Sequence, residues 1–528
     1  MNSIDAHIIS LIIFLPLLAS FVVALLPSLR VAKIVAFAAS LATFIASLHL
    51  WFHFDPTSVD LQFVEQLPWM PELGVSYLVG VDGLNLLLIL LSTFLTPLLL
   101  LSIWEFSGEG HKSLMALLLV LECGMIGALV AFDVVLFYIF WEVMLIPMYF
   151  IIGIWGGKNR IYATTKFVIY TVSGSLLMLV AAIALYFYHG EQAGFYSTSL
   201  LDLYKLAAAG GIPGEEYLFL AFLLAFAIKV PLWPFHTWLP HAHTEAPTVG
   251  SVILAGVLLK MGTYGLLRFA IPLFPQAVLL YAPSILALAV VGIVYGALTA
   301  WVQEDAKKMV AYSSVSHLGF VVLGSLAIVG NQLSAEALTG AVYQMINHGL
   351  STGALFFLVG MIYERRHSRM FSDFGGLAEV MPYFALMLII ATLSSIGLPG
   401  TGGFVGEFLI LLGVFQAQPL VAILATSGVI LGALYMLTFC RKILFGPITH
   451  VANRQLVDLS RREYLYITPL IVLTVFMGVF PELFLSKIRS SVGHLASNFQ
   501  HYHLKIAGVH PAASDAEPPV DESAVIQP

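Results

Sequence analysis

Long runs of apolar residues, separated by short polar segments, make up most of the chain. The hydrocarbon core of a bilayer is about 30 Å thick, and a helix needs about 20 apolar residues to cross it. The runs are continuous and do not alternate residue by residue, as the strands of a membrane β-barrel would. The pattern predicts an all-α polytopic membrane protein with about fourteen spans, near 8–27, 32–52, 84–103, 113–131, 134–154, 166–188, 217–239, 249–271, 277–301, 309–330, 337–362, 381–415, 420–444 and 464–486.

Lysine and arginine are unevenly distributed between the two sets of predicted loops. With the N-terminus placed outside, the inside loops hold fifteen of these residues and the outside loops hold two, Lys205 and Arg268. Cytoplasmic loops of membrane proteins are enriched in both residues. We therefore expect an even number of spans, with both termini on the periplasmic side of a bacterial inner (plasma) membrane; a mitochondrial inner membrane is the alternative.

The first apolar run is expected to stay in the mature protein. No Lys or Arg precedes it, and no convincing small-residue cleavage site follows it, so it does not resemble a secretory signal peptide.

Two predicted spans contain helix-breaking residues. One carries Lys229-Val-Pro-Leu-Trp-Pro234, and the other carries Gly397-Leu-Pro-Gly-Thr-Gly-Gly403. Proline removes a helical hydrogen bond, and broken spans in two halves of a chain indicate an inverted-repeat transporter. We expect two broken helices in two inverted five-helix repeats.

These repeats give a simple domain plan. It consists of an N-terminal three-span region (1–110), two repeats (111–272 and 273–445), a last span (446–490) and a polar tail (491–528). The tail is rich in Pro, Ala, Asp and Glu, which predicts disorder with no further long helix.

Composition excludes several classes of protein. Of the 528 residues, 59% are hydrophobic and 10% are charged, and the mean hydropathy is +0.94, so a water-soluble fold is excluded. The two cysteines, Cys123 and Cys440, are far apart, and no cysteine and histidine pattern predicts zinc, haem or an iron–sulfur cluster. A glycine-rich phosphate loop is also missing from the sequence. We expect this chain to bind no cofactor or metal, and no nucleic acid.

Four ionisable residues within predicted spans stand out as candidates: Glu142, Lys229, Lys260 and Glu407. A charge at that depth costs about 2.5–3.5 kcal/mol on insertion scales, so each residue needs a partner or a task. A carboxylate and a lysine that pair and separate can load and release a proton, because each changes the proton affinity of the other. The alternatives are a static ion pair for Glu142 and Lys229, a lysine at 260 that reaches the interface, and a helix-capping role for Glu407.

Two histidines, His317 and His348, also fall inside predicted spans. Histidine titrates near neutral pH and suits a proton relay, although a buried histidine is as often a packing residue. Together they would bridge Lys260 and Glu407. Glu122 and Glu105 are weaker candidates for the same chemistry.

A further group, His236, His241, His243 and Glu245, follows the first helix break. Its spacing is compatible with a metal site. At a membrane interface without cysteine, proton intake or a plain interfacial role fits this group better.

Four segments together resemble a known family: FWEVMLIPMY, AFAIKVPLWPFHTWLPHAHTEAPT, LLKMGTYGLLRF and GLPGTGGFVGEF. They are similar to the antiporter-like subunits of NADH:quinone oxidoreductase (respiratory complex I) and to relatives in multisubunit sodium/proton antiporters. The resemblance covers roughly residues 80–445. It implies a fourteen-helix core with inverted five-helix repeats and one proton channel.

The resemblance also implies roles for individual residues. Glu142 and Lys229 would form a pair on the intake side, Lys260 the central relay and Glu407 the terminal exchanging group, with His317 and His348 between them. Two of the three antiporter-like subunits of complex I carry lysine where this chain has Glu407, and the largest has a long lateral helix that the tail is expected to lack. Both differences point to the middle subunit.

Under this resemblance, NADH, FMN, iron–sulfur clusters and quinone would be bound by partner subunits. The partners would be other membrane and peripheral subunits, especially neighbouring antiporter-like subunits, within the lipid bilayer. Three alternatives remain: a subunit of a sodium/proton antiporter, which would share the same core, a membrane-bound hydrogenase or formate-linked complex that uses the same module, and a structural anchor. Four deep charges and two broken helices disfavour the anchor.

Overall fold

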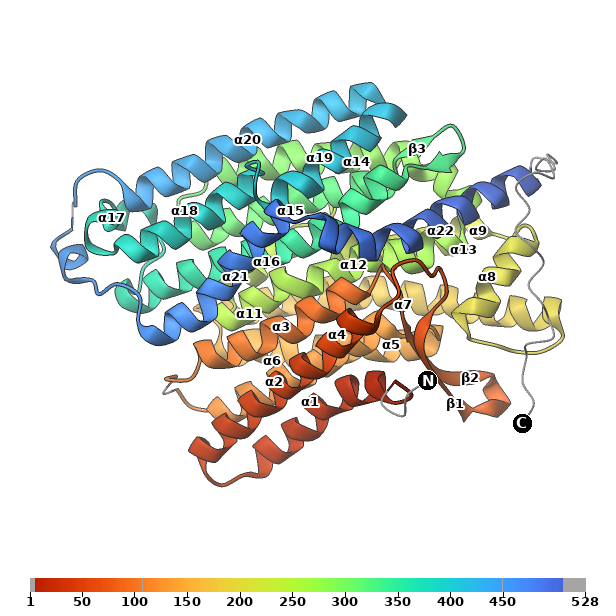
Figure 1. The fold of residues 1–528 in the computed structure, drawn as a ribbon, viewed down its shortest axis with the longest axis horizontal. Coiled ribbons are helices and arrows are strands. Elements are labelled where there is room, and N and C mark those ends of the chain that lie inside the picture. The colour runs from red at the N-terminus through yellow and green to blue at the C-terminus, as the bar shows by residue number, and fades with distance from the viewer. Residues whose placement is uncertain (1–4, 107, 449, 507–528) are drawn as a thin grey trace.

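The computed structural model describes residues 5–106, 108–448 and 450–506. Most of these residues form helices that run side by side along the long axis of the molecule (Figure 1). Ten helical segments of the described chain are long and apolar enough to cross a membrane. The chain is therefore a multi-pass membrane protein, as the apolar runs predict.

The helices follow the predicted spans closely. The longer ones are α1 (Ile8–Leu25), α2 (Leu29–His53), α3 (Leu86–Ser102), α4 (His111–Val130), α5 (Val134–Val143), α6 (Leu145–Trp155), α7 (Arg160–Ala193), α8 (Leu200–Ala209), α9 (Glu215–Lys229), α10 (Trp238–Glu245), α14 (Pro275–Trp301), α15 (Ala306–Ser325), α16 (Ala335–Arg366), α18 (Pro382–Ile396), α19 (Gly402–Ala417), α20 (Pro419–Leu444), α21 (Arg461–Val479) and α22 (Glu482–Ile506). Short helical pieces are η1 (Pro71–Leu73), α13 (Ile271–Leu273), η4 (Phe371–Asp373), α17 (Leu377–Val380) and η5 (Val451–Gln455).

Strands are few and lie at one end of the bundle (Figure 1). β1 (Gln62–Met70) and β2 (Val75–Val81) form an antiparallel hairpin with two register irregularities, and β3 (Ile328–Val329) pairs with β4 (Gln332–Leu333). The buried Asp133 carboxylate anchors the hairpin because it accepts hydrogen bonds from the Ser76 amide (3.0 Å) and the Thr198 hydroxyl (2.6 Å).

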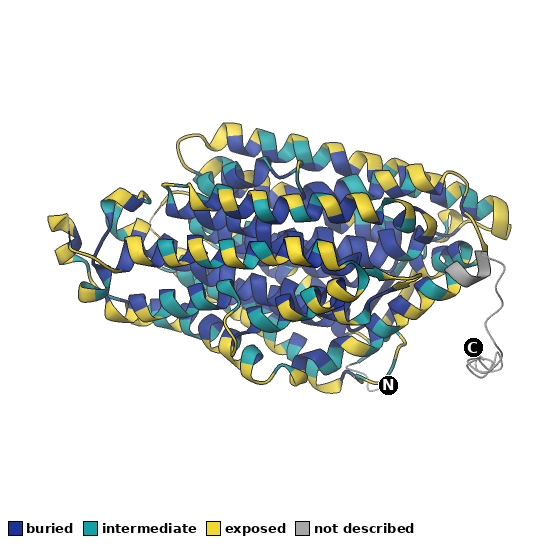
Figure 2. Cartoon of the chain, turned by 90° about the horizontal axis from the view of Figure 1, so that it is seen from above, coloured by how far each residue is buried: buried dark blue, intermediate teal, exposed yellow. Residues whose placement is uncertain are grey.

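Burial divides the helices into a core and an exposed shell (Figure 2). The apolar windows of α16 and of the segment Thr248–Leu273 are buried over their whole length, whereas those of α2, α7 and α20 are about one-third buried or less. The segment Thr248–Leu273, which carries Lys260, and α16, which carries His348, therefore form the centre of the core.

Both predicted helix breaks are present. α9 ends at Lys229 and α10 begins at Trp238, whose indole donates to the Ile228 carbonyl (2.8 Å) and so satisfies an acceptor that the break frees. α18 ends at Ile396, and Gly397 has a φ of +79°, a backbone conformation that glycine adopts without strain.

A third irregularity was not predicted from the sequence. The helical segment around Lys260 consists of α11 (Thr248–Ile253), π-helical η2 (Leu254–Leu258), α12 (Leu259–Gly265) and π-helical η3 (Leu266–Ala270). Such wide turns occur frequently at functional sites. The sequence shows only a continuous apolar run there.

The prediction of a disordered tail from residue 491 is wrong as far as Ile506, because α22 continues to that residue. Val492, Leu495, Ala496 and Phe499 recur at helical spacing and are buried. Their polar neighbours lower the local hydropathy and conceal this amphipathic pattern. The remainder of the predicted tail, 507–528, lies outside the described residues.

The placement of Arg268 in an outside loop is also wrong. This residue lies within η3, is 5% exposed, and its Nη2 is 2.6 Å from Oδ1 of Asp82. A buried ion pair lets a charged residue sit inside an apolar run.

Candidate functional site

Lys260 lies at the centre of the bundle and is completely buried. Its ammonium donates to Nδ1 of His348 on α16 (2.7 Å) and to the carbonyl of Ala255, which belongs to the π-helical turn. A side chain at residue 349 could not be accommodated, because a Cβ on Gly349 would lie 2.7 Å from the Gly256 carbonyl oxygen. The glycines therefore let α16 approach η2 closely enough for His348 to reach Lys260.

Glu407 forms the other end of the buried polar line. Its Oε1 accepts hydrogen bonds from Nδ1 of His317 on α15 (2.9 Å) and from the Gln344 amide on α16 (3.1 Å). Both histidine and glutamate are buried. Nε2 of His317 lies 3.3 Å from the Tyr435 hydroxyl. The carboxylate thus has specific partners on two helices.

The two histidines bring these ends together. The ring centroids of His317 and His348 are 5.7 Å apart, and Nε2 of His348 has no hydrogen-bond partner. The structure therefore places Lys260, His348, His317 and Glu407 in one buried row, broken only between the imidazoles.

A polar branch continues from Glu407 toward the break between α18 and α19. The Asn347 amide donates to the Gln344 side chain (3.4 Å), and the Ser394 hydroxyl donates to Asn347 (3.4 Å). Ser394 lies near the C-terminus of α18. Polar groups thus extend from the glutamate to the broken helix.

Lys229 and Glu142 are arranged differently. Lys229, the last residue of α9, is 3% exposed, and its ammonium lies 4.9 Å from the ring centroid of Trp141. Glu142 exerts an attractive charge interaction on Lys229, but none of the ion pairs within 4 Å among the described residues joins them. One carboxylate oxygen of Glu142 is buried without a hydrogen-bond partner. Lys229 and Glu142 therefore attract each other but do not form a direct ion pair in this structure.

His243 is a further buried histidine, and it has charge interactions with a residue of the row and with a residue of a polar cavity. It is completely buried, stacks on Phe356 with centroids 4.7 Å apart, and neither ring nitrogen has a hydrogen-bond partner. Its charge interactions are with Lys307 and Lys260. Lys307, Glu245 and Arg369 line a cavity of about 130 Å³.

The remaining candidates contribute less. Glu122 is fully buried in α4, and neither carboxylate oxygen has a partner that meets hydrogen-bond criteria, although Thr96 is close. His236 and His241 do not join the row, and Glu105 pairs with Arg462 (3.1 Å). Within the described chain, no group of three or more His, Cys, Asp or Glu side chains could hold a metal.

Sequence reasoning missed several polar partners: Gln344, Asn347 and Tyr435. Their signal was available in part, since Gln344 stands one helical turn before His348 and Asn347 directly precedes it. The sequence gives no signal for the contact of Trp141 with Lys229, because an aromatic residue in a membrane helix is ordinarily a packing residue.

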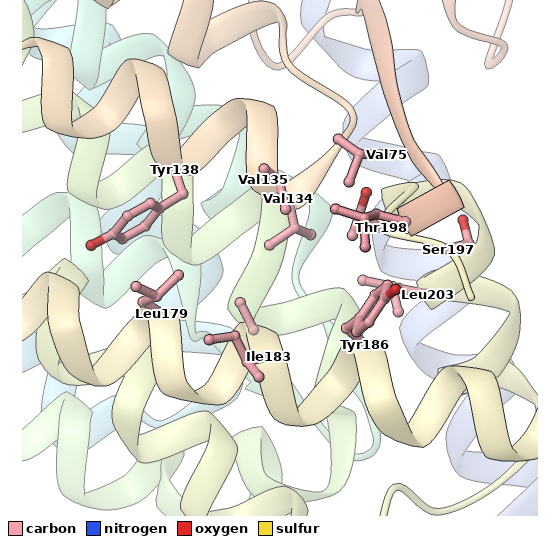
Figure 3. Close-up of a pocket in the computed structure, with 12 residues that line it drawn as sticks. Val75, Val134, Val135, Tyr138, Leu179, Ile183, Tyr186, Ser197, Thr198 and Leu203 are labelled. Carbon is pink, nitrogen blue, oxygen red and sulfur yellow. The ribbon is translucent and has the colours of Figure 1, made fainter. Parts of the chain in front are cut away.

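A separate pocket of about 200 Å³ lies between α5, α7 and α8 (Figure 3). Its lining is mostly apolar, with Tyr138 and Val135 of α5 facing Leu179 and Ile183 of α7. Tyr138 is the lining residue that interacts with Glu142. The pocket flanks the site and is not part of the buried row.

Comparison with known proteins agrees with this geometry. Residues 131–432 match the family model described as NADH:quinone oxidoreductase/Mrp antiporter, transmembrane. The chain is 46% identical over 506 residues to NADH-quinone oxidoreductase subunit M of Rhodobacter capsulatus, covering 93% of this chain and 97% of that protein. The chain belongs to this family. It is also 41% identical over 491 residues to NADH-ubiquinone oxidoreductase chain 4 of Marchantia polymorpha, covering 92% and 96% of the two chains.

Two solved structures share the fold of this chain. A chain of respiratory complex I from Thermus thermophilus superposes with a TM-score of 0.83 at 32% identity, covering 93% of this chain and 99% of that one. A chain of the Mrp complex from Dietzia sp. DQ12-45-1b gives a TM-score of 0.81 at 21% identity, covering 96% and 100%. The second similarity concerns the fold alone.

Proposed function

We propose that this antiporter-like subunit translocates protons within an NADH:quinone oxidoreductase, and that the row from Lys260 to Glu407 carries them. The observation that carries the proposal is the row itself: two hydrogen-bonded pairs, Lys260 with His348 and His317 with Glu407, meet at adjacent imidazoles in the buried core. High identity over nearly the whole length to two named subunits of that enzyme supports the assignment.

Protons would cross the row in short steps. When Lys260 loses its proton, its ammonium no longer donates to Nδ1 of His348, and this nitrogen is free to bind a proton. Glu407 can accept a proton through His317. The imidazole rings are not hydrogen-bonded to each other, so transfer between them requires a ring rotation or a bridging water. We assign proton exchange with one aqueous side to His243 and the cavity beside Lys307, and exchange with the other side to the branch at Asn347 and Ser394.

The Glu142 and Lys229 pair would control this row. Moving one charge through 100 mV costs about 2.3 kcal/mol, whereas a change of two pKa units in a lysine supplies about 2.7 kcal/mol. The free energy available from forming and breaking the pair thus exceeds the cost of moving one charge only by a small margin. We therefore expect both partners to be needed.

The finer architecture belongs to the same proposal. Joining α5 to α6, α9 to α10, the pieces of Thr248–Leu273, and α18 to α19 gives fourteen crossings. We assign 111–272 and 273–445 to two inverted repeats, one with each broken helix, and place both termini on the periplasmic face of a bacterial inner membrane. NADH, FMN, iron–sulfur clusters and quinone would reside in partner subunits.

NADH-driven proton uptake by inverted membrane vesicles, recorded together with NADH oxidation by quinone, tests this function. Lys260→Met should abolish uptake, because the uncharged side chain neither donates to His348 nor carries a proton. Lys205→Met is the control, since the Lys205 side chain is 81% exposed and should leave both activities unchanged. Loss of sodium/proton exchange with normal NADH oxidation would instead identify an independent antiporter.

A further inference from the structure

A second buried polar cluster stands at the end of the bundle that carries the strands. It lies on the same helical segment as Lys260, since Tyr264 follows Lys260 by one turn and Arg268 follows Tyr264 by another. Nε of Arg268 donates to the Tyr264 hydroxyl (3.1 Å), and Nη2 lies 2.6 Å from Oδ1 of Asp82, which directly follows β2. The guanidinium therefore lies between Lys260 and the strand end of the bundle.

Hydrogen bonds hold the side chains of this cluster in one arrangement. The Tyr264 hydroxyl and the Asn85 side-chain amide both donate to the Leu129 carbonyl at the end of α4 (2.6 and 2.9 Å). The Asp82 carboxylate also accepts hydrogen bonds from the backbone amides of Leu84 (2.9 Å) and Asn85 (3.3 Å). These contacts join α3 and α4 to the helical segment of Lys260 and fix the side chains around the guanidinium.

α8 and α22 pack over Arg268 at this end of the bundle. Tyr204 of α8 donates to the Arg268 carbonyl, and Tyr502 of α22 donates to the Tyr204 carbonyl (2.9 Å). The Gly83 amide, just before α3, donates to the Ser491 hydroxyl of α22 (2.8 Å). Figure 1 shows α8 and the C-terminal part of α22 at the same end of the bundle as the β1–β2 hairpin. The cluster is therefore enclosed between the Lys260 segment and two peripheral helices.

The groups around Arg268 would be able to relay protons if the guanidinium were absent. A free carboxylate at Asp82 can take up and release a proton, and the hydroxyls of Tyr264 and Tyr204 can donate and accept. These groups reach from one turn beyond Lys260 to the covering helix α8. A guanidinium prevents this relay in two ways, because it stabilises the ionised carboxylate and does not lose its own proton in proteins.

We propose that Arg268 seals the strand end of the Lys260 segment against protons, because its guanidinium occupies Asp82 and cannot itself release a proton. The seal matters because the proposed exit lies on the branch beside Glu407, and an opening next to Lys260 would let protons bypass the buried row. The inference rests on the proposed function, since it takes Lys260 as a proton carrier. Loss of the seal should leave NADH oxidation intact and uncouple it from proton uptake.

Passive proton flux through the intact complex, reconstituted in liposomes without NADH, tests the seal. A pH difference is imposed across the membrane, valinomycin and potassium balance the charge, and a dye inside the liposomes reports the decay of the difference. Arg268→Lys keeps the ion pair, but lysine can release its proton. A positioned donor speeds proton transfer by about 10²- to 10⁴-fold, so the decay should become at least about tenfold faster. Arg365→Lys is the matched control, since Arg365 pairs with Glu463 at the same distance (2.6 Å) near the C-terminus of α16, the end away from β4.

Asp82→Asn separates a seal from a purely structural ion pair. This variant breaks the pair, but it leaves the guanidinium in place and removes the carboxylate that could accept a proton. Its liposomes should therefore stay as tight as those with the wild-type complex. A leak in Asp82→Asn that equals or exceeds the leak in Arg268→Lys would overturn the proposal, as would an unchanged decay in Arg268→Lys.

Combining Arg268→Lys with Lys260→Met separates this inference from the proposed function. The double variant should be tight again, because protons would reach the cluster through Lys260, and a leak that persists would overturn the seal. If Arg268→Lys alone is tight while Lys260→Met abolishes NADH-driven uptake, only the seal is wrong. If Lys260→Met leaves uptake unchanged, the proposed function itself fails.

Discussion

The two broken helices place their charged residues in contrasting surroundings. Beside the α18–α19 break, Glu407 accepts hydrogen bonds from His317 and Gln344. Beside the α9–α10 break, Lys229 faces an indole ring, and Glu142 has an unpartnered oxygen. Glu407, at the first end, is therefore fixed by hydrogen bonds. Lys229 and Glu142, at the second end, are held by long-range charge attraction, so they can pair or separate at low energetic cost. This difference suits a relay at the first end and a switch at the second.

The largest effect should come from removing the proton carrier at the first end. Glu407→Gln retains the size and an acceptor for His317 but cannot ionise. A positioned acid or base contributes about 10²- to 10⁴-fold to proton transfer, so NADH-driven uptake should fall at least a hundredfold. Glu407→Asp should recover part of it. Undiminished uptake in the glutamine variant would remove Glu407 from the path.

Packing at the same break should be intolerant of any side chain. A Cβ on Gly403 would lie 2.1 Å from the Ser394 carbonyl oxygen, whereas one on Gly432 would meet only the Tyr435 hydroxyl at 3.9 Å. Overpacking costs about 1–3 kcal/mol, so Gly403→Ala should lower the thermal midpoint of the purified complex. Gly432→Ala is the control, and equal midpoints would show that the break is loosely packed.

Matched glutamine variants should separate the two ends by stability. Glu407→Gln weakens hydrogen bonds to a charged acceptor, a loss of about 1.5–3 kcal/mol, while Glu142→Gln loses no partner at its buried oxygen. Thermal denaturation should therefore show a lower midpoint for the first variant and little change for the second. Similar shifts for both would mean that Glu142 is bonded as firmly as Glu407.

The smallest effect should come from the aromatic neighbour of Lys229. Trp141→Phe weakens the interaction of the ammonium with the ring, which is worth about 0.5–2 kcal/mol. We expect NADH-driven uptake to fall by less than tenfold, with Trp69→Phe as the control, since Trp69 is an exposed residue of β1. A complete loss of uptake would make Trp141 a required element and not a modulator.

Much of this site can be predicted from the sequence, because charge inside an apolar run is costly wherever it occurs. That argument locates Lys260 and Glu407 without coordinates, and the Pro and Gly residues inside two spans locate both helix breaks. It does not reveal that Lys260 bonds to His348, because this contact depends on the approach of Gly256 and Gly349 from different helices. It also misplaces Arg268, since the partner, Asp82, is far away in the chain.

The π-helical turns beside Lys260 and the amphipathic α22 were missed for a related reason. A wide turn leaves no composition signal in an apolar run. α22 combines moderate hydropathy with a helical pattern, so a search for spans passes over it. Its hydrogen bond from Tyr502 to the Tyr204 carbonyl (2.9 Å) shows that tertiary contacts hold it in place.

The most direct test of the switch is NADH-driven proton uptake by inverted vesicles that carry Lys229→Ala, with NADH oxidation by quinone followed in the same sample. If Lys229 controls the row from Lys260 to Glu407, uptake and coupled oxidation should fall together. Wild-type values for both would contradict the account, because the charge beside the first break would then have no part in moving protons.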